Sequence, residues 1–286
     1  IANRVYFEYL QSLVTFCTCG EIWGSGVSEC VFTCGLAQNK CILSTVSMRV
    51  RYIGTGEAFD HRVPNTSILV DGDQRLLLDC GYSVPHALWA QSLDPDFLDG
   101  IYLSHFHADH CFGLPALLGR MNQDGRKRPL WILSGPGGKE SSLRVLRVGY
   151  PSMPEKLHYL LHFVEVEPGT AATVGQFNLK TALSKHSVPN HAVRIGDGQV
   201  SVAYSGDGAF SDQCEALYED VDLLIHETYY ENASSKSHSS ISDVRSMAQR
   251  QRVKQLHMLH LSRDLALPKD VQLPDTGDEF LVGSGC

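Results

Sequence analysis

One short segment constrains this chain more than any other, Ser104-His105-Phe106-His107-Ala108-Asp109-His110. It holds three imidazoles and one carboxylate within six residues, directly after the apolar run 101–103 and before the helical pattern of residues 114–121. Imidazole and carboxylate together suit zinc and similar divalent ions. Alternation around the loop should direct its first two histidines to one ion, and its aspartate and third histidine to a second. We therefore expect a metal site where a strand passes into a helix.

Three further candidate ligands stand where later apolar runs end, namely His186, Asp207 and His260. Polar side chains at the loops that leave a sheet are where binding and catalytic sites gather on layered folds. Asp207 has a glycine on each side, which favours a tight turn. Taken singly, each of these residues is more often structural. Together with the histidine-rich loop they predict a site for two ions, with one aspartate free to bridge them.

The rest of the chain reads as many short apolar runs and a few helices. Strands are expected at residues 49–53, 67–70, 76–78, 101–103, 130–133, 163–166, 177–183, 192–195, 200–204, 221–225, 255–261 and 280–282. Helices are expected at residues 85–91, 114–121 and 240–251, and another after Gly135-Pro136-Gly137-Gly138. Many strands with a few helices indicate an α/β fold in which two sheets are faced by helices.

The first 47 residues differ from the rest and contain five of the nine cysteines. Cys17, Cys19, Cys30 and Cys34 could bind zinc, but their spacing matches no common structural pattern. A strand pattern opens at Met48, so we expect residues 48–286 to form the functional domain and residues 1–47 to be a Cys-rich N-terminal extension. The other cysteines are scattered, which is typical of buried thiols in a reducing compartment. No apolar run approaches the roughly 20 residues that span a bilayer. We therefore expect a cytoplasmic protein without a membrane partner.

The set His-x-His-x-Asp-His, followed by a distant His, Asp and His, resembles the metallo-β-lactamase superfamily. Within it, the chain is most similar to the tRNase Z (ribonuclease Z) branch and its phosphodiesterase relatives. The supporting phrases are Ile53-Gly54-Thr55-Gly56, Asn65-Thr66-Ser67, Leu78-Asp79-Cys80-Gly81, Gly113-Leu114-Pro115, Gly135-Pro136-Gly137, Tyr204-Ser205-Gly206-Asp207, His226-Glu227-Thr228 and His238-Ser239-Ser240. The resemblance covers residues 48 to about 263. It implies an αββα sandwich of two mixed sheets flanked by helices.

The resemblance also implies the roles of the ligands. One zinc ion would be bound by His105, His107 and His186, the other by Asp109, His110 and His260, and Asp207 would bridge them. Mn²⁺ or Fe²⁺ could replace zinc. Two such ions can activate a water and clamp a phosphodiester.

The same resemblance implies the catalytic side chains. His238 would donate a proton to the leaving oxygen, and the His226-Glu227 pair would support the site. These three residues and Asp109 are the candidate catalytic residues. Asp79 would orient a ligand histidine.

Two departures from the tRNase Z pattern bear on the substrate. Residues 138–174 contain no basic insertion rich in glycine and proline that could serve as a tRNA-gripping arm, and Leu261-Ser262-Arg263-Asp264 lacks the tyrosine expected after the last ligand. The net charge of −8 also gives no general attraction to RNA. Arg263 could contact a phosphate or could be an ordinary surface arginine. His191 could line the substrate pocket.

Several functions stay open on the sequence. The expected function is that of a phosphodiesterase resembling tRNase Z, an RNA 3′-end endonuclease that acts on precursor tRNA. The first alternative is a phosphodiesterase for a small nucleotide such as a cyclic nucleotide, which the missing arm and the acidic charge favour. A lactonase-type ester hydrolase and an inactive metal-binding scaffold are the remaining alternatives, because fold alone does not fix function. His238 and the His226-Glu227 pair favour phosphorus over carbonyl chemistry. A homodimer is expected by analogy.

Overall fold

The computed structural model describes residues 28–32, 41–45, 48–72, 74–175, 177–232, 234–265 and 273–283. The chain divides into two compact units, Met48–Val282 and a second made of Ile1–Ser47 with Gly283–Cys286. In the latter, β1 (Ser28–Phe32) pairs antiparallel with β2 (Cys41–Thr45). The cysteine side chains of residues 1–47 lie outside the described part of the chain. The extension status expected for this segment therefore stays a prediction.

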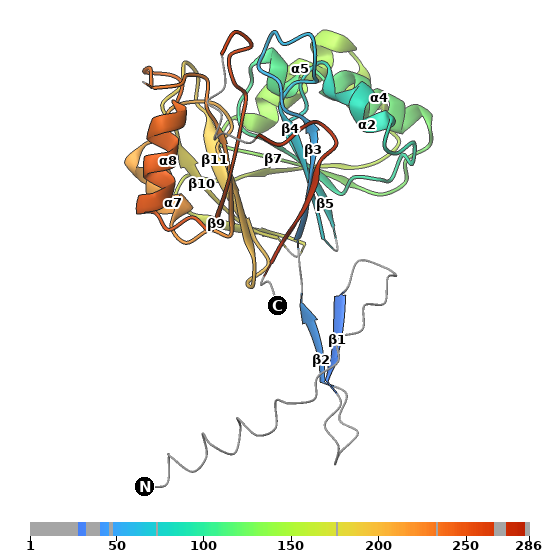
Figure 1. Ribbon diagram of the computed structural model, residues 1–286. Coiled ribbons are helices and arrows are strands. Elements are labelled where there is room, and N and C mark those ends of the chain that lie inside the picture. Colours follow the sequence, from blue (N-terminus) through green and yellow to red (C-terminus); the bar gives the residue numbers. More distant parts are fainter. Residues whose placement is uncertain are drawn as a thin grey trace, which may run out of the picture. The chain divides into compact units, whose positions relative to one another are not determined.

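Unit Met48–Val282 is built around two mixed sheets that face each other (Figure 1). The first has the order β15-β3-β4-β5-β6-β7-β8. Its strands are β3 (Met48–Gly54), β4 (Ser67–Asp71), β5 (Arg75–Leu78), β6 (Gly100–Leu103), β7 (Leu130–Ser134), β8 (Leu161–Glu165) and β15 (Glu279–Val282). The second has the order β14-β13-β12-β11-β10-β9. Its strands are β9 (Ala171–Val174), β10 (Phe177–Leu183), β11 (His191–Gly196), β12 (Ser201–Tyr204), β13 (Leu223–Glu227) and β14 (Gln255–Leu259).

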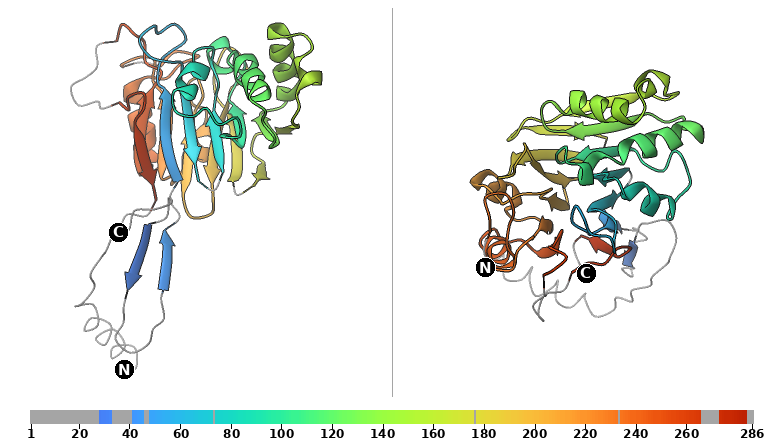
Figure 2. Two further views of the ribbon diagram at one scale, coloured as in Figure 1. Left: turned by 90° about the vertical axis from the view of Figure 1, so that its right-hand side faces the viewer. Right: turned by 90° about the horizontal axis from the view of Figure 1, so that it is seen from above.

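Helices cover the outer faces of both sheets, which gives four layers (Figure 2). Against the first sheet lie α2 (Val84–Trp89), α3 (Ala108–Cys111), α4 (Leu114–Gln123), α5 (Gly138–Gly149) and α6 (Met153–Lys156). Against the second lie α7 (Asp212–Tyr218) and α8 (Ile241–Arg250). This arrangement confirms the predicted αββα sandwich.

Side-chain alternation along the strands explains the layers. In β3, Met48, Val50 and Tyr52 are buried in the core between the two sheets, whereas Ile53 joins the core beneath the helices. Successive side chains of a strand point to opposite faces, so a strand covered on both faces must be apolar throughout. The near-continuous apolar runs in the sequence are therefore strands of sheets buried on both sides.

The predicted elements agree with the structure except at some ends. The short elements α3, α6, α7 and β9 and the β1-β2 pair were not predicted. The strand predicted through residue 261 ends at Leu259, because His260 adopts a left-handed conformation with φ of 57°. Its backbone N–H donates to Thr55 O at 3.1 Å instead of continuing the ladder. Strand β13 extends to Glu227, two residues beyond the prediction.

His257 on β14 packs against Tyr52 and Phe280 in the core between the sheets. Its Nδ1 lies 2.6 Å from the Tyr52 hydroxyl, and burial lowers the pKa of His257 to about 4. An unfolded histidine has a pKa of about 6.5, so stability contributed by the neutral ring is lost as the pH falls from about 6.5 toward 4. Between pH 7 and pH 5, we expect metal-free wild type to lose about 1–2 kcal/mol more stability than His257→Gln in urea unfolding. Equal losses in the two proteins would contradict this prediction.

Cys80, Cys111 and Cys214 are free and buried, which confirms the expectation of buried thiols for these three. Cys111 packs in the core beneath the helices and donates its thiol hydrogen to His107 O, so it serves packing. Within the described ranges, no helix has the length and apolar character needed to cross a membrane.

Candidate metal centre

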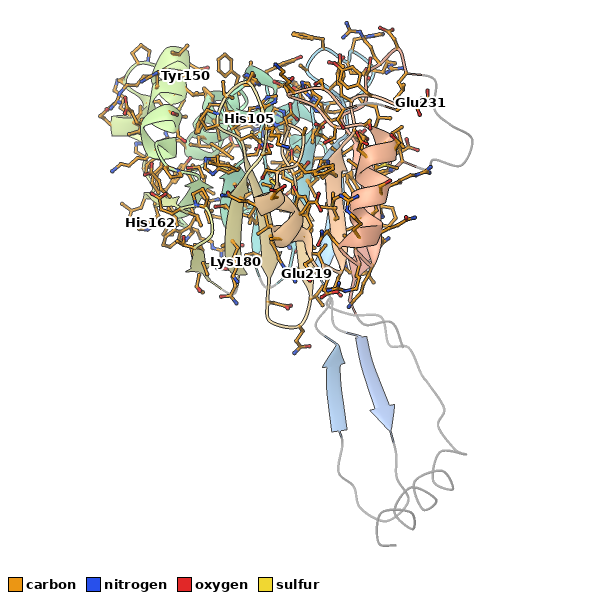
Figure 3. All side chains as sticks on the ribbon, turned by 90° about the vertical axis from the view of Figure 1, so that its left-hand side faces the viewer. His105, Tyr150, His162, Lys180, Glu219 and Glu231 are labelled. Atoms are coloured by element: carbon orange, nitrogen blue, oxygen red, sulfur yellow. The ribbon has the colours of Figure 1, made fainter. Side chains whose placement is uncertain are left out.

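The histidine-rich segment is the connection from β6 to α3. His105 and His107 lie in the loop, whereas Asp109 and His110 belong to the first turn of α3. The chain around Gly81 passes directly beneath this turn. A Cβ at Gly81 would stand 1.9 Å from Asp109 O, so only glycine permits this approach. The backbone thus brings four potential ligands to one end of the sandwich. Figure 3 shows His105 toward this end, and Lys180 and Glu219 toward the opposite end.

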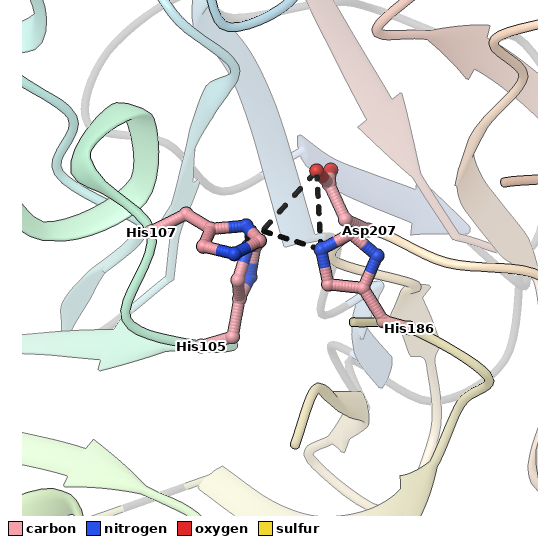
Figure 4. Close-up of side chains that lie close together, drawn as sticks. All are labelled: His105, His107, His186 and Asp207. Atoms are coloured by element: carbon pink, nitrogen blue, oxygen red, sulfur yellow. Dashed lines mark hydrogen bonds and ion pairs between the residues drawn. The ribbon is translucent and has the colours of Figure 1, made fainter. Parts of the chain in front are cut away.

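The first ligand group consists of His105, His107, His186 and Asp207, whose donor atoms lie within 4.8 Å of one another (Figure 4). His107 Nδ1 is 3.0 Å from His105 Nε2 and 3.1 Å from His186 Nε2. Asp207 Oδ2 is 4.0 Å from the Nε2 atoms of both His105 and His186. His186 Nδ1 donates to Ser237 O at 3.0 Å, which turns its Nε2 toward the group.

The second ligand group consists of Asp109, His110, Asp207 and His260, under the same distance limit of 4.8 Å. His110 Nε2 lies 3.1 Å from Asp109 Oδ2 and 3.3 Å from Asp207 Oδ1. His260 Nε2 lies 3.3 Å from Asp207 Oδ2. Asp207 therefore belongs to both groups. The structure brings all the predicted metal ligands together, in the two sets that the sequence analysis gave.

The electrostatics of these groups fit a divalent cation. His110 Nε2 and Asp207 Oδ1 are buried and form no hydrogen bond of good geometry, although buried polar atoms normally have a partner. Burial lowers the pKa of His105 well below its usual value, so this ring is neutral and its nitrogen is free to bind a metal. Burial also opposes charge on His110, but Asp207 and Asp79 raise its pKa well above the usual value. The negative charges of Asp207 and Asp79, which favour a proton on His110, would also favour a metal cation at its Nε2.

Asp79 fixes the orientation of this second group from behind. It is fully buried, and its Oδ2 accepts from His110 Nδ1 at 2.8 Å, Ser104 Oγ at 2.7 Å and the Tyr204 hydroxyl at 2.8 Å. Its Oδ1 accepts from the Ser104 backbone N–H at 2.8 Å. A carboxylate bonded to the far nitrogen of a ligand histidine fixes its tautomer and raises its basicity. The contact expected between Asp79 and a ligand histidine is present at His110.

Replacing Asp79 with asparagine should weaken metal binding about 10–100-fold, because His110 loses a charged partner. Asparagine tolerates the left-handed backbone of this position, whose φ is 61°. Competition with a chromophoric zinc chelator measures the affinity. Tyr204→Phe is the matched control, since it removes a single hydrogen bond to the same carboxylate. Affinity unchanged in Asp79→Asn would show that Asp79 does not support the site.

His238 lies beside both ligand groups. Its ring centroid is 5.3 Å from that of His186 and 6.4 Å from that of His260. Its Nδ1 is 3.7 Å from Glu227 Oε1. Burial disfavours the charged ring, but the Glu227 carboxylate outweighs it, and the pKa of His238 is raised above its usual value. This histidine is thus placed to carry a proton beside the predicted ions.

Glu227 is fully buried and fixes the segments on either side of the site. Its Oε1 accepts from Ser239 N at 2.8 Å and from Gly208 N at 3.1 Å, so one carboxylate ties the residue after His238 to the residue after Asp207. Its Oε2 accepts from Tyr229 N at 3.1 Å.

His226 does not join the cluster. It precedes Glu227 on β13 and points to the opposite face, where its ring contacts those of Tyr218 and Phe210. Its Nδ1 bonds to Glu227 O at 2.7 Å. His226 was expected to support the site together with Glu227 and was a candidate catalytic residue. The structure places only Glu227 beside the site, because neighbouring side chains of a strand face opposite ways.

Two supporting residues were not anticipated in these roles. Asn190 Nδ2 donates to Ser205 O and Asp207 O, and its Oδ1 accepts from Asp207 N, so Asn190 shapes the turn that carries the shared aspartate. Thr66 Oγ1 lies 3.2 Å from His260 Nδ1. Thr66 stands in the phrase Asn65-Thr66-Ser67, which supports the family resemblance and could have identified it, whereas no sequence signal pointed to Asn190.

His191 and Arg263 have definite places near the site. His191 is buried, its backbone N–H donates to Ser104 O, and its ring fills the space where a Cβ at Gly135 would lie. Arg263 Nη1 donates to Glu57 Oε1 at 2.6 Å, so this side chain is fixed by a buried carboxylate.

Comparison with known proteins places this geometry in a family. The sequence model of the family described as "Anti-Pycsar protein Apyc1" matches residues 48–270. The ribonuclease Z of Methanosarcina mazei is 28% identical over 275 residues, covering 75% of this chain and 88% of that protein.

Two solved structures have the same fold. The metallo-β-lactamase fold protein YhfI from Bacillus subtilis superposes with a TM-score of 0.70 at 22% identity, covering 82% of this chain and 99% of that one. The short form of human tRNase Z also gives a TM-score of 0.70, at 21% identity, covering 83% of this chain and 100% of that one. The predicted metallo-β-lactamase fold and the resemblance to tRNase Z proteins are confirmed. The chain belongs to the Anti-Pycsar protein Apyc1 family and is a metal-dependent hydrolase of the metallo-β-lactamase fold.

Proposed function

We propose that this hydrolase is a two-ion phosphodiesterase whose substrate is a small phosphodiester of the cyclic-nucleotide class. The observation that carries the proposal is that Asp207 belongs to both ligand groups while His238 lies beside a histidine of each. A bridging carboxylate between two sets of nitrogen and oxygen donors is suited to a pair of divalent ions. Zinc fits this donor set, and Mn²⁺ or Fe²⁺ are the alternatives.

Each of the two ligand groups would bind one ion. His105, His107 and His186 would hold one ion, Asp109, His110 and His260 would hold the other, and Asp207 would contact both. When bound, such ions would lower the pKa of a water molecule and offset the charge of the phosphodiester. The contacts behind the ligands, Asp79 to His110 and Ser237 to His186, fix which ring nitrogen faces the ions.

His238 donates a proton to the oxygen that leaves phosphorus. An alkoxide is a poor leaving group, so protonation as the bond breaks contributes about 10²–10⁴-fold to the rate. Glu227 acts as a positioning residue, because it anchors Ser239 and balances the charge of the protonated ring. The raised pKa of His238 supports this role, since the ring must carry a proton near neutral pH.

Two observations favour a small substrate over precursor tRNA. Residues 138–174, all of which the structure describes, form α5, α6, β8 and β9 with short connections and no protruding arm. The net charge is −8, whereas binding a folded RNA draws on many phosphate contacts with basic residues.

Cleavage of precursor tRNA at its 3′ end is the second candidate. The curated relatives named ribonuclease Z favour it.

The experiment compares substrate classes on zinc-loaded full-length protein. It uses 3′,5′-cyclic nucleotides, a precursor tRNA with a 3′ trailer, bis(p-nitrophenyl) phosphate and an acyl lactone, with chelator-treated protein as the control. We expect metal-dependent hydrolysis of the cyclic nucleotides and the aryl diester. A single cut at the tRNA 3′ boundary without cyclic-nucleotide hydrolysis would move the assignment to tRNase Z chemistry. Hydrolysis of the lactone alone would contradict phosphodiester chemistry altogether.

A further inference from the structure

The loop between β3 and β4, residues 55–66, forms one side of the metal centre. Thr55 O accepts the His260 backbone N–H at 3.1 Å, and Thr66 Oγ1 lies 3.2 Å from the ring of the same histidine. Figure 1 shows this loop in blue at the top of the sandwich, the end at which Figure 3 places His105. Both ends of this loop are therefore anchored at a proposed metal ligand, His260.

A buried carboxylate fixes the loop in one conformation. Glu57 is 2% exposed, and its two oxygens have different partners. Oε1 accepts from Arg263 Nη1 at 2.6 Å, and Oε2 accepts from the Phe59 backbone N–H at 2.9 Å. Burying a carboxylate is unfavourable unless it is paired and hydrogen-bonded, and here both conditions are met. One group thus holds Arg263, three residues after His260, next to the backbone of Phe59.

The groups that Glu57 holds are themselves exposed. The Phe59 ring is 76% exposed, and the Arg263 side chain is 42% exposed. Tyr82, which is 50% exposed, donates its hydroxyl hydrogen to Ala58 O and supports the loop from the side of Gly81, next to Asp109. A single exposed aromatic residue is common on protein surfaces. This one differs because the buried Glu57 carboxylate ties its backbone to Arg263, which follows a proposed metal ligand by three residues.

We propose that Phe59 and Arg263, held by Glu57, recognise the nucleobase of the substrate. Phe59 stacks on the base, and the free N–H groups of Arg263 donate to a base carbonyl oxygen. Every nucleobase offers an aromatic face, and stacking on an aromatic side chain tolerates any sequence. Glu57 Oε1 accepts from Nη1 of Arg263, and the other N–H groups of the planar guanidinium can donate to a carbonyl oxygen of a base.

A hydrogen bond from Arg263 to a base carbonyl would distinguish between nucleobases. Uracil, cytosine and guanine carry a carbonyl oxygen, whereas adenine carries none. Arg263 therefore favours nucleotides of the first three bases over adenine nucleotides. The inference rests on the proposed function, because it names the nucleotide part of the substrate of the same site.

Calorimetric titration of the zinc-loaded full chain tests the inference without relying on hydrolysis. The ligands are uridine, guanosine and adenosine 5′-monophosphates and inorganic phosphate. We expect wild type to bind the uridine and guanosine nucleotides more tightly than the adenosine nucleotide and far more tightly than phosphate. Phe59→Ala should weaken all three nucleotides about tenfold while phosphate binding changes less than about twofold. Arg263→Gln and Glu57→Gln should remove the preference over the adenosine nucleotide.

Zinc content, measured on each variant, separates recognition from damage to the metal centre. Leu281→Ala is the matched control, since Leu281 is an exposed apolar side chain on β15 that pairs with Arg49 near the far end of β3. Equal losses for nucleotides and phosphate in Phe59→Ala, or no loss, would overturn the inference. Base-dependent binding in a protein that hydrolyses no phosphodiester would leave the recognition intact and remove the proposed function. If the protein hydrolysed cyclic nucleotides but these substitutions left nucleotide binding unchanged, the proposed function would stand and the proposed base recognition would be wrong.

Discussion

Asp207→Ala should lower kcat/KM for phosphodiester hydrolysis by at least about 1,000-fold and reduce the bound metal below two ions per chain. Asp207 is the one side chain shared by the two ligand groups, with oxygens 3.3 Å from His110 Nε2 and from His260 Nε2. Its loss leaves both groups without their common anion. The five ligand imidazoles would then face two positive ions with one carboxylate, Asp109 of the second group, remaining among the ligands.

The measurement pairs kcat/KM on an aryl phosphodiester with metal content after dialysis. Asp207→Asn is a second variant of nearly the same shape, which guards against loss of folding in the alanine variant. Asp124→Ala, which removes an exposed carboxylate at the end of α4, should behave like wild type. If Asp207→Ala and Asp207→Asn kept two ions and most of the activity, the shared aspartate would not be part of the centre.

His238→Ala should produce a loss that depends on the leaving group. For a cyclic nucleotide, whose leaving oxygen is an alkoxide, we expect kcat to fall about 10²–10⁴-fold. For bis(p-nitrophenyl) phosphate, whose nitrophenolate leaves without a proton, the fall should stay within about tenfold. Metal content should not change, because His238 lies outside both ligand groups.

Tyr229→Phe is the control for this experiment, since the Tyr229 ring lies 5.0 Å from that of His238 and the substitution keeps the packing. Equal losses on the two substrates would mean that His238 positions the substrate or the metal ligands and does not donate a proton. A large loss confined to the alkyl substrate would assign the proton donor.

The metal ligands were predictable from sequence because their chemistry is local. Four of them stand within six residues at the end of one strand, and His186 and Asp207 follow strands that the apolar pattern identifies. Strand β6 belongs to one sheet and β10 and β12 belong to the other. Because the two sheets pack face to face, side chains that follow these strands can meet at one end of the sandwich, as the fold class implies.

The features that the sequence did not predict depend on the geometry of single residues or on contacts between residues far apart in the sequence. The role predicted for His226 disagreed with the structure because strand β13 runs through both residues of the His226-Glu227 pair, and alternation buries Glu227 beside the site and His226 behind it. The pairing of Glu57 with Arg263 joins residues 206 positions apart, and no sequence pattern signals it. Helix α7 has seven residues, too few for a helical period to stand out.

The central claim is that two ions occupy the two ligand groups, and anomalous diffraction tests it most directly. Data collected at the zinc absorption edge from crystals of the zinc-loaded protein locate the ions without reference to activity. The account predicts two peaks about 3.5–4 Å apart, one among His105, His107 and His186, the other among Asp109, His110 and His260, with Asp207 in contact with both. A single peak, or peaks elsewhere on the chain, would contradict it.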